Sequence, residues 1–433
     1  MPNETLDSTL RERLLAAPRP RRLPLAPLAE PARRRLPLAS EARHVDQRFR
    51  PIYAVWELTL ACDLACRHCG SRAGRARPDE LTTEECLRVV NEIAELGVRE
   101  VTLIGGEAYL RPDCLEIIRA IVLTGMTVTM TSGGRGIDSE RARQMADAGI
   151  AGVSISLDGL QTVHDRLRRV VGSFAAALRA LENLRAWRVP VTVNSQINRL
   201  SMPDLEGLLD VITAAGAHSW QLSLTVPMGR AADEPEVLLQ PFELLELFPR
   251  LTLLAARSRE RGVRFFPANN VGYFGPFESQ LRPYNRDCHA GSCTAGLLTL
   301  GIEADGTVKG CPSLSTAAWA SGNLRDERLL DIWERGLPLR YTRDRSVSSL
   351  WGFCRTCYYA DSCRAGCTWT SDVFFGRPGN NPYCHHRALA HAERGERERL
   401  VPVEAASGLP FDHGRFEIIV EPAPTRAEPM SNP

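Results

Sequence analysis

The stretch "TLACDLACRHCG", residues 59–70, places three cysteines within eight positions. Cys62, Cys66 and Cys69 have the spacing C-x3-C-x2-C. Four cysteines would complete a tetrahedral zinc site, whereas three leave a coordination position open. Because thiolates also hold iron–sulfur clusters, this spacing favours a [4Fe–4S] cluster with one open iron. The alternative is a zinc ion completed by His68 or by a distant residue.

Composition and charge limit the partners that the chain can have. The formal net charge of the 433 residues is +1, so bulk charge indicates neither a nucleic-acid nor a membrane partner. No apolar run reaches the ~18 residues of a membrane span, and the first residues lack the pattern of a secretory signal. We therefore expect a cytoplasmic protein with reduced thiols. Its 13 cysteines then indicate metal binding rather than disulfides.

Strands and helices alternate from residue 51 onward. Strands are expected over residues 53–60, 100–107, 127–134, 151–159, 189–197 and 219–226. Helices are expected between them, over residues 81–97, 112–124, 138–148, 174–188 and 205–215. Thr82 and Glu85 have the spacing of a capping box at the start of the first helix. This order predicts an α/β fold, a partial (β/α)6 barrel whose active site lies at the carboxyl ends of the strands.

The remaining segments suggest four regions. Residues 1–50 are rich in Arg and Pro, which predicts a mostly extended N-terminal extension, either a disordered leader or a docking arm. The barrel is expected over residues 51–265. Residues 266–390 gain Gly, Cys and aromatic residues, which suggests a small domain held together by metal. Residues 391–433 are charged and then Pro-rich, and we expect a partly ordered tail.

The cysteine loop after the first strand of such a barrel resembles the defining motif of the radical S-adenosylmethionine (radical SAM) family. The resemblance covers roughly residues 51–265. It implies that the amino and carboxylate groups of S-adenosylmethionine (SAM) chelate the open iron. One electron from a low-potential cluster then cleaves SAM and releases a 5′-deoxyadenosyl radical. SAM and a [4Fe–4S] cluster are the cofactors that this resemblance implies.

Two segments match the cofactor-binding parts of the family. Gly105, Gly106 and Glu107 follow the second strand as "GGE", whose backbone receives the methionine amino group in the family. "SLDG" follows the fourth strand, where the family places polar ribose contacts. This position makes Ser156 and Asp158 candidate ribose ligands.

Candidate partners for the SAM carboxylate lie in "HDRLR", residues 164–168, which resembles the HD-x-x-R segment of the family. The resemblance suggests Arg168, because a guanidinium fork suits a carboxylate. Arg166 and Arg169 are rivals, and a solvated basic face is the alternative for all three. Asn194 and Gln196 in the fifth strand are candidates for cofactor or substrate contacts, or serve structure.

Most of the other ten cysteines form a second pattern. Cys86 and Cys114 lie in expected helices and are interpreted as core residues. The pattern comprises C-x12-G-x4-C from Cys293 to Cys311, then "CRTCYYADSCRAGC" at 354–367, and then Cys384. It resembles the seven-cysteine SPASM domain that follows many radical SAM barrels, and Cys288 supplies an eighth ligand. Two zinc sites with the same spacings are the alternative.

The resemblance implies two auxiliary [4Fe–4S] clusters with four cysteines each. The ligands implied for auxiliary cluster I are Cys288, Cys293, Cys311 and Cys367. Those implied for auxiliary cluster II are Cys354, Cys357, Cys363 and Cys384. Full ligation indicates electron transfer rather than substrate binding at iron.

Barrels with this C-terminal domain mostly modify peptides and proteins. The resemblance therefore implies an oxidoreductase that matures a ribosomally synthesised precursor peptide, with an auxiliary cluster accepting the substrate's electron. It also implies a flavodoxin- or ferredoxin-type electron donor. Because residues 1–50 are too short and too proline-rich for a leader-binding domain, that role falls to a separate leader-binding protein or to the tail itself.

Two alternatives remain open from the sequence. A sulfatase maturase that makes formylglycine would carry an Asp base directly after the third cysteine of auxiliary cluster I, where this chain has Pro312. A non-catalytic iron–sulfur electron carrier would not need the SAM-binding residues. No catalytic residue is assigned. Of the acids near Pro312, Asp305 is expected in a hairpin turn and Glu303 on the surface of a strand.

Overall fold

A computed structural model describes residues 38–285 and 291–424. Cys288 and most of the Arg- and Pro-rich N-terminal extension lie outside these residues. Among the described helices, none combines the length and apolar character needed to cross a membrane.

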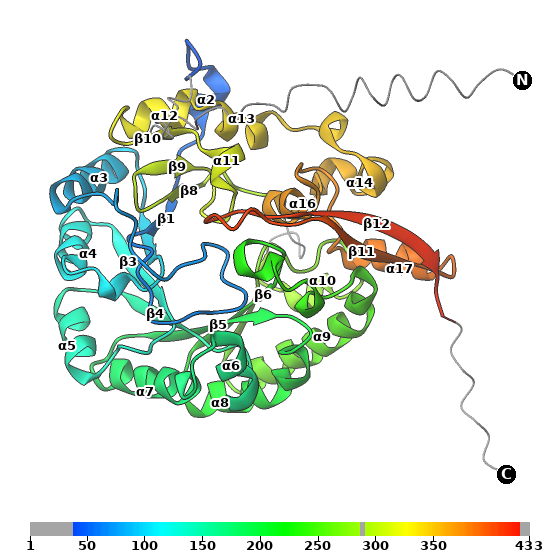
Figure 1. Ribbon diagram of the computed structural model, residues 1–433, viewed down its shortest axis with the longest axis horizontal. Helices are drawn as coiled ribbons and strands as arrows, with labels where there is room; N and C mark the ends of the chain where they lie inside the picture. The colour runs from blue at the N-terminus through cyan, green and yellow to red at the C-terminus, as the bar shows by residue number, and fades with distance from the viewer. Residues whose placement is uncertain (1–37, 286–290, 425–433) are drawn as a thin grey trace, which may run out of the picture. The chain divides into compact units, whose positions relative to one another are not determined.

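One sheet of ten strands organises the chain, in the order β10-β9-β8-β1-β2-β3-β4-β5-β6-β7 (Figure 1). The six strands expected from the sequence run parallel in chain order. They are β1 (Tyr53–Glu57), β2 (Glu100–Ile104), β3 (Thr127–Ser132), β4 (Gly152–Ser156), β5 (Val191–Ile197) and β6 (Ser219–Leu224). The partial barrel predicted from the alternating pattern is confirmed.

Helices cover the outer side of these strands (Figure 1). The expected ones are α3 (Thr83–Glu95), α4 (Cys114–Leu123), α5 (Ser139–Asp147), α7 (Ser173–Ala186) and α8 (Leu205–Ala214), and α9 (Leu244–Glu260) follows. The capping box of α3 is confirmed: Glu85 N donates to Thr82 Oγ1 over 3.2 Å and Thr82 N donates to Glu85 Oε2 over 2.9 Å. Cys86 and Cys114 lie in the buried core, as expected.

Alternation along the strands separates two environments. In β5 the buried residues Val191, Val193 and Ile197 alternate with half-buried polar ones. Successive side chains of a strand point to opposite faces. Thr192 and Asn194 therefore line a polar cavity inside the barrel, while the aliphatic residues pack toward the helices.

The sheet continues beyond the six expected strands. β7 (Arg264–Pro267) pairs parallel with β6, and β8 (Thr299–Ile302) pairs parallel with β1. β9 (Thr307–Lys309) and β10 (Gly322–Asn323) follow antiparallel. The Cys-rich region is therefore anchored to the barrel by backbone hydrogen bonds to its first strand.

Short helices make up most of the rest of the Cys-rich region. They are α10 (Glu278–Leu281), α11 (Thr316–Trp319), α12 (Leu329–Arg335), α13 (Leu337–Asp344), α14 (Gly352–Thr356), α15 (Ala360–Cys363), α16 (Thr368–Phe375) and α17 (His385–Ala392). None of these helices is longer than eight residues. Helices this short are not stable by themselves, so tertiary contacts must stabilise them.

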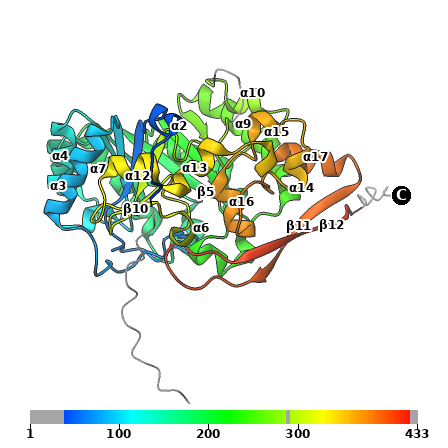
Figure 2. The same ribbon diagram turned by 90° about the horizontal axis from the view of Figure 1, so that it is seen from above.

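The described parts of both chain ends contain regular secondary structure. Residues 44–48 form helix α2 (His44–Arg48), whose Asp46 is fully buried and pairs with Arg340 and Arg343 at 2.9 and 3.2 Å. At the other end, β11 (Glu396–Glu404) and β12 (Arg415–Pro422) pair antiparallel (Figure 2). β12 packs against α16 and β11 against α17. These long-range contacts order the described parts of both ends, and a mostly extended N-terminal extension and a partly ordered tail stay predictions for the chain ends as a whole.

Candidate active site

Backbone hydrogen bonds hold the cysteine loop at the carboxyl end of β1. Leu58 N donates to Ile104 O over 2.9 Å, and Cys62 N donates to Gly74 O over 3.1 Å. Arg230 closes the loop from another segment, because its Nε donates to Cys66 O over 2.7 Å and its Nη1 to Ala73 O over 3.1 Å. The loop is therefore positioned by the sheet and by one half-buried guanidinium.

The thiols of this loop lie in a poorly solvated site. Cys66 is buried, and Cys62 and Cys69 are half-buried. Burial raises the pKa of the Cys62 thiol to about 12 and also raises that of Cys66. A cationic metal centre lowers the pKa of a coordinating thiol and stabilises its thiolate. The donor set therefore fits an iron–sulfur cluster.

The "GGE" segment docks against the cysteine loop so closely that only glycine fits. Gly106 N donates to Thr59 O over 2.7 Å, and Glu107 N donates to Ala61 O over 2.8 Å. A Cβ atom on Gly105 would lie 2.3 Å from Thr59 O, and one on Gly106 would lie 2.1 Å from Ala61 O. Both distances are far shorter than van der Waals contact, so the two segments form a tight backbone cradle.

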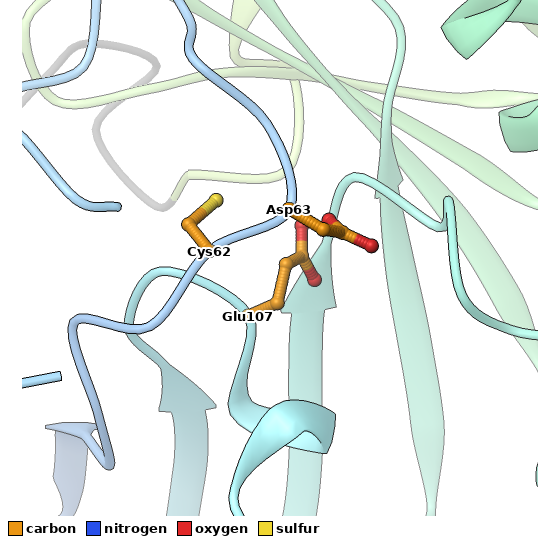
Figure 3. A group of neighbouring side chains, drawn as sticks. All are labelled: Cys62, Asp63 and Glu107. Carbon is orange, nitrogen blue, oxygen red and sulfur yellow. The ribbon is translucent and has the colours of Figure 1, made fainter. Parts of the chain in front are cut away.

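Glu107 places a buried carboxylate beside this cradle (Figure 3). Its oxygens accept hydrogen bonds from Ser132 Oγ over 2.5 Å and from Gly133 N over 2.6 Å. Burial raises the pKa of Glu107 to about 7. Ligand atoms of Cys62, Asp63 and Glu107 lie within 4.8 Å of one another. A cationic group bound here would meet both carboxylates.

Asp158 and Arg168 form a buried ion pair that also lies beside the cysteine loop. Arg168 Nη2 lies 2.6 Å from Asp158 Oδ2, and Arg168 Nη1 lies 3.6 Å from Cys66 Sγ. His68 Nε2 lies 3.2 Å from the same Asp158 oxygen, and Gln196 N donates to the other over 2.8 Å. Although burial opposes ionisation, Arg168 and His68 hold the pKa of Asp158 well below its usual range.

The three rival arginines occupy different environments. Arg166 and Arg169 are exposed, and Arg169 pairs with Glu234. Arg168 is buried and lines the cavity next to the cysteine loop. A solvated basic face therefore describes Arg166 and Arg169 but not Arg168.

One cavity of about 290 Å³ collects the predicted site residues. It is lined by all three loop cysteines and by Gly105, Gly106, Glu107, Ser156, Asp158 and Arg168, and also by Asn194 and Gln196. These residues come from the carboxyl ends of β1, β2, β4 and β5 and from α6 (Gln161–Arg168). Their convergence is the arrangement that a parallel α/β fold provides for a ligand.

A second chamber of about 250 Å³ adjoins the first and shares His68, Cys69, Ile104, Gly105 and Gln196 with it. Glu57 at the end of β1 also lines it, and other walls come from distant parts of the chain: Pro312, Ser313, Trp369 and Phe411. The chamber therefore connects the cysteine loop with the residue that follows Cys311.

The loop between β11 and β12 contributes Phe411 to the wall of this chamber. Phe411 N donates to Gly70 O over 3.1 Å, and Gly229 N donates to Asp412 O over 2.8 Å. Arg72 Nε donates to Asp412 Oδ1 over 2.8 Å. The sequence did not indicate that this C-terminal segment reaches the site, because nothing in its composition distinguishes it from a tail.

The described SPASM cysteines gather in two groups. Burial raises the pKa of the Cys367 thiol to about 12, and the nearby Cys293 and Cys311 add to the rise. Cys354 and Cys363 are in turn neighbours of Cys384. Cys357 is a neighbour of both Cys354 and Cys363. Buried Tyr273 lies between the groups, because its hydroxyl accepts a hydrogen bond from Cys367 N over 3.0 Å and it is also close to Cys363 and Cys384.

Of the two expectations for the acids near Pro312, one is confirmed and one is wrong. Asp305 Oδ1 accepts a hydrogen bond from Thr307 N over 3.0 Å in the turn between β8 and β9, as expected for a turn residue. Glu303 is buried rather than on the surface. Lys309 Nζ and Arg77 Nη1 lie 2.6 and 2.9 Å from its carboxylate oxygens, and these ion pairs compensate the burial.

Sequence comparison agrees with this geometry. Residues 56–205 match the radical SAM superfamily, and residues 293–358 match the SPASM iron–sulfur cluster-binding domain. The mycofactocin maturase MftC of Mycobacterium ulcerans is 31% identical over 360 residues, which are 81% of this chain and 93% of that protein. An AdoMet-dependent heme synthase of Methanosarcina barkeri is 27% identical over 78% of this chain and 97% of its own. The PqqA peptide cyclase of Ruegeria pomeroyi is 28% identical over 79% and 91%.

Solved structures show the same fold. Streptococcus suis SuiB bound to S-adenosylmethionine has a TM-score of 0.58 at 17% identity, covering 77% of this chain and 76% of that one. The structure described as native anSMEcpe with bound AdoMet has a TM-score of 0.62 at 17% identity, covering 78% and 95%.

This chain belongs to the radical SAM superfamily and carries a C-terminal SPASM domain. It is an enzyme whose cofactors are SAM, the [4Fe–4S] cluster that binds SAM, and auxiliary iron–sulfur clusters. The zinc and electron-carrier alternatives are therefore set aside.

Proposed function

We propose that this enzyme oxidatively modifies a ribosomally synthesised precursor peptide. The observation that carries the proposal is the near-complete coverage of two relatives named for peptide maturation, 93% of the maturase MftC and 91% of the PqqA peptide cyclase. The residues that the SAM cavity and the chamber beside Pro312 share support it, because a substrate in the chamber would lie next to Cys69 and Pro312.

Within this proposal, Cys62, Cys66 and Cys69 hold the cluster that binds SAM. When bound, the cluster and SAM supply a 5′-deoxyadenosyl radical that abstracts a hydrogen atom from the substrate. The backbone of Gly105–Glu107 binds the methionine amino group, and the carboxylate of Glu107 is placed to accept a hydrogen bond from it. The tight cradle around these residues would hold that group in one position.

Arg168 is proposed to bind the SAM carboxylate. Its buried Nε has no hydrogen-bond partner among the described residues, so it leaves a donor for a ligand. Asp158 holds the guanidinium in place through the 2.6 Å ion pair. Ser156 and Asp158 line the cavity where the ribose is proposed to bind.

The eight SPASM cysteines are proposed to hold two auxiliary clusters in the two groups already described, with Cys288 completing the first. We further propose that a flavodoxin- or ferredoxin-type protein donates electrons, that a separate protein or the N-terminal extension binds the leader peptide, and that the enzyme acts in the cytoplasm. The Cys-rich region is proposed as a domain over residues 266–390, after the barrel at 51–265.

The chamber favours a peptide over a haem-type substrate. Haem and its precursors carry carboxylate side chains, which cationic residues recognise. Among the described residues that line the chamber, none is Lys or Arg, and Glu57 is acidic. Pro312 also lines the chamber, so the position where sulfatase maturases keep an Asp base cannot accept a proton here.

The test is anaerobic incubation of the reconstituted enzyme with SAM, dithionite and a synthetic peptide. The peptide is the one encoded by a short reading frame beside the gene. Mass spectrometry is expected to show the loss of two hydrogen atoms from the peptide together with formation of 5′-deoxyadenosine. An unchanged peptide, with conversion of a carboxylate-bearing tetrapyrrole instead, would contradict the proposal.

A further inference from the structure

A carboxylate stands at the carboxyl end of β1, inside an otherwise apolar strand. Glu57 is 1% exposed, and its neighbours Trp56 and Leu58 are also buried. It lines the chamber that the cysteine loop and Pro312 share. A buried carboxylate in a strand is costly unless it is compensated or used. Because Glu57 lies in the wall of the chamber, it differs from buried acids that only link helices and strands to one another.

The contacts of Glu57 orient it without fully neutralising it. Ala304 N donates to Glu57 Oε1 over 3.3 Å, and Arg77 Nη2 lies 3.3 Å from the same oxygen. Arg77 is shared, because its Nη1 lies 2.9 Å from Glu303 and 3.4 Å from Asp305. Both contacts of Glu57 are therefore long, and its main cation serves three carboxylates.

The two buried acids of this network differ in their affinity for a proton. Burial raises the pKa of Glu57 to about 8, with Glu303 adding to the rise and Arg77 and Lys309 opposing it. Despite burial, Lys309 and Arg77 lower the pKa of Glu303. The adjacent strand β2 presents apolar Ile104 opposite Glu57. Of the two acids, Glu57 therefore takes up the proton more readily, at a pKa close to the operating pH of a general base.

We propose that Glu57 is the general base that accepts the substrate's proton during oxidation, in the role that Pro312 cannot fill. The inference rests on the proposed function. The substrate loses one hydrogen atom to the 5′-deoxyadenosyl radical, and this breaks a C–H bond. The resulting radical then loses one electron to an auxiliary iron–sulfur cluster and one proton to the Glu57 carboxylate. Two hydrogen atoms leave the substrate in total, and a double bond or a ring-closing bond forms.

The experiment compares wild-type holoenzyme with Glu57→Gln, which keeps the size of the side chain and removes the base. The readout is the ratio of modified neighbouring-gene peptide to 5′-deoxyadenosine. General-base catalysis is worth about 100-fold or more, so the ratio is expected to fall at least that far in Glu57→Gln. In the wild type the ratio rises with pH and levels off above about 8, because the base must be ionised. In Glu57→Gln this rise is absent.

Two further variants separate catalysis from structure. Glu57→Asp keeps a carboxylate and is expected to keep a pH-dependent ratio with a shifted midpoint, which also decides the question if Glu57→Gln does not fold. Glu303→Gln removes the other buried acid of the network, which does not line the chamber among the described residues, and is expected to retain most of the ratio. An unchanged ratio and pH profile in Glu57→Gln, or an unshifted midpoint in Glu57→Asp, would overturn the inference.

Infrared difference spectra provide a readout that needs no peptide. Wild-type holoenzyme is expected to show protonated carboxyl absorption at pH 6.5 that is lost at pH 9.5, with contributions from Glu57 and Glu107, and Glu57→Gln is expected to lack the Glu57 part of this signal. If the wild type leaves the peptide unchanged, the proposed function fails, and the infrared band still reports on Glu57. A Glu57 that stays ionised over this pH range would overturn the inference by itself.

Discussion

The close approach of "GGE" to the cysteine loop predicts that Gly106→Ala weakens SAM binding. The added Cβ would lie 2.1 Å from Ala61 O, whereas ordinary contact begins at 3.4 Å, so the two segments must separate by about 1.3 Å. The hydrogen bonds that join them, now 2.7 and 2.8 Å long, would break. At about 1 kcal/mol each, their loss costs about 2 kcal/mol.

If this cost falls on the formation of the SAM site, the Kd for SAM rises by about 30-fold, since 1.4 kcal/mol corresponds to a factor of ten. Equilibrium dialysis of SAM with anaerobically reconstituted protein measures this change. Gly74→Ala is the matched control on the same loop, because a Cβ there meets nothing within 4 Å. The reasoning is refuted if Gly106→Ala binds SAM as tightly as Gly74→Ala and holds the same amount of iron.

Three other predictions concern cofactors and substrate. Arg168→Lys loses the planar guanidinium that pairs with Asp158 at 2.6 Å, so we expect SAM affinity to fall about tenfold or more in the same dialysis assay. The control is Arg166→Lys at an exposed position, which should bind SAM normally. Replacing Cys62, Cys66 and Cys69 with Ala should remove about a third of the iron, because the eight other proposed ligands remain. It should also abolish the cleavage of SAM. Iron analysis that shows no loss would exclude these cysteines as ligands. The enzyme should leave a sulfatase-derived Cys or Ser peptide unconverted, since Pro312 stands where a base is required. A mass loss that matches thiol-to-aldehyde conversion would favour formylglycine formation instead.

Features that depend on neighbours in the chain could be predicted from the sequence. The six strands and their helices follow from the local alternation of apolar residues, and the capping box of α3 depends on residues three positions apart. The cysteine spacing likewise indicated an open metal site, because all three cysteines lie on one loop. Family resemblance then supplied the cofactor-binding candidates, which the parallel sheet brings to one cavity.

Features that depend on distant contacts could not be predicted in this way. Glu303 was expected on the surface, but Lys309 and Arg77 compensate its charge inside the protein. For the chain ends, composition did not indicate that Asp46 pairs with Arg343 almost 300 positions away or that Phe411 reaches Gly70. Such pairings depend on which surfaces meet, and composition does not carry that information.

The local pattern thus determined the barrel, its cysteine loop and the class of chemistry. Only the tertiary structure decided what surrounds that chemistry. Pairing of β8 with β1 places Ala304 beside Glu57 and Pro312 in the wall of the chamber. Residues 247 positions apart become hydrogen-bonded there, and the environment of Glu57, rather than its identity in the sequence, makes it a candidate base. Burial and charge belong to the folded arrangement, and they determine how readily a carboxylate takes a proton.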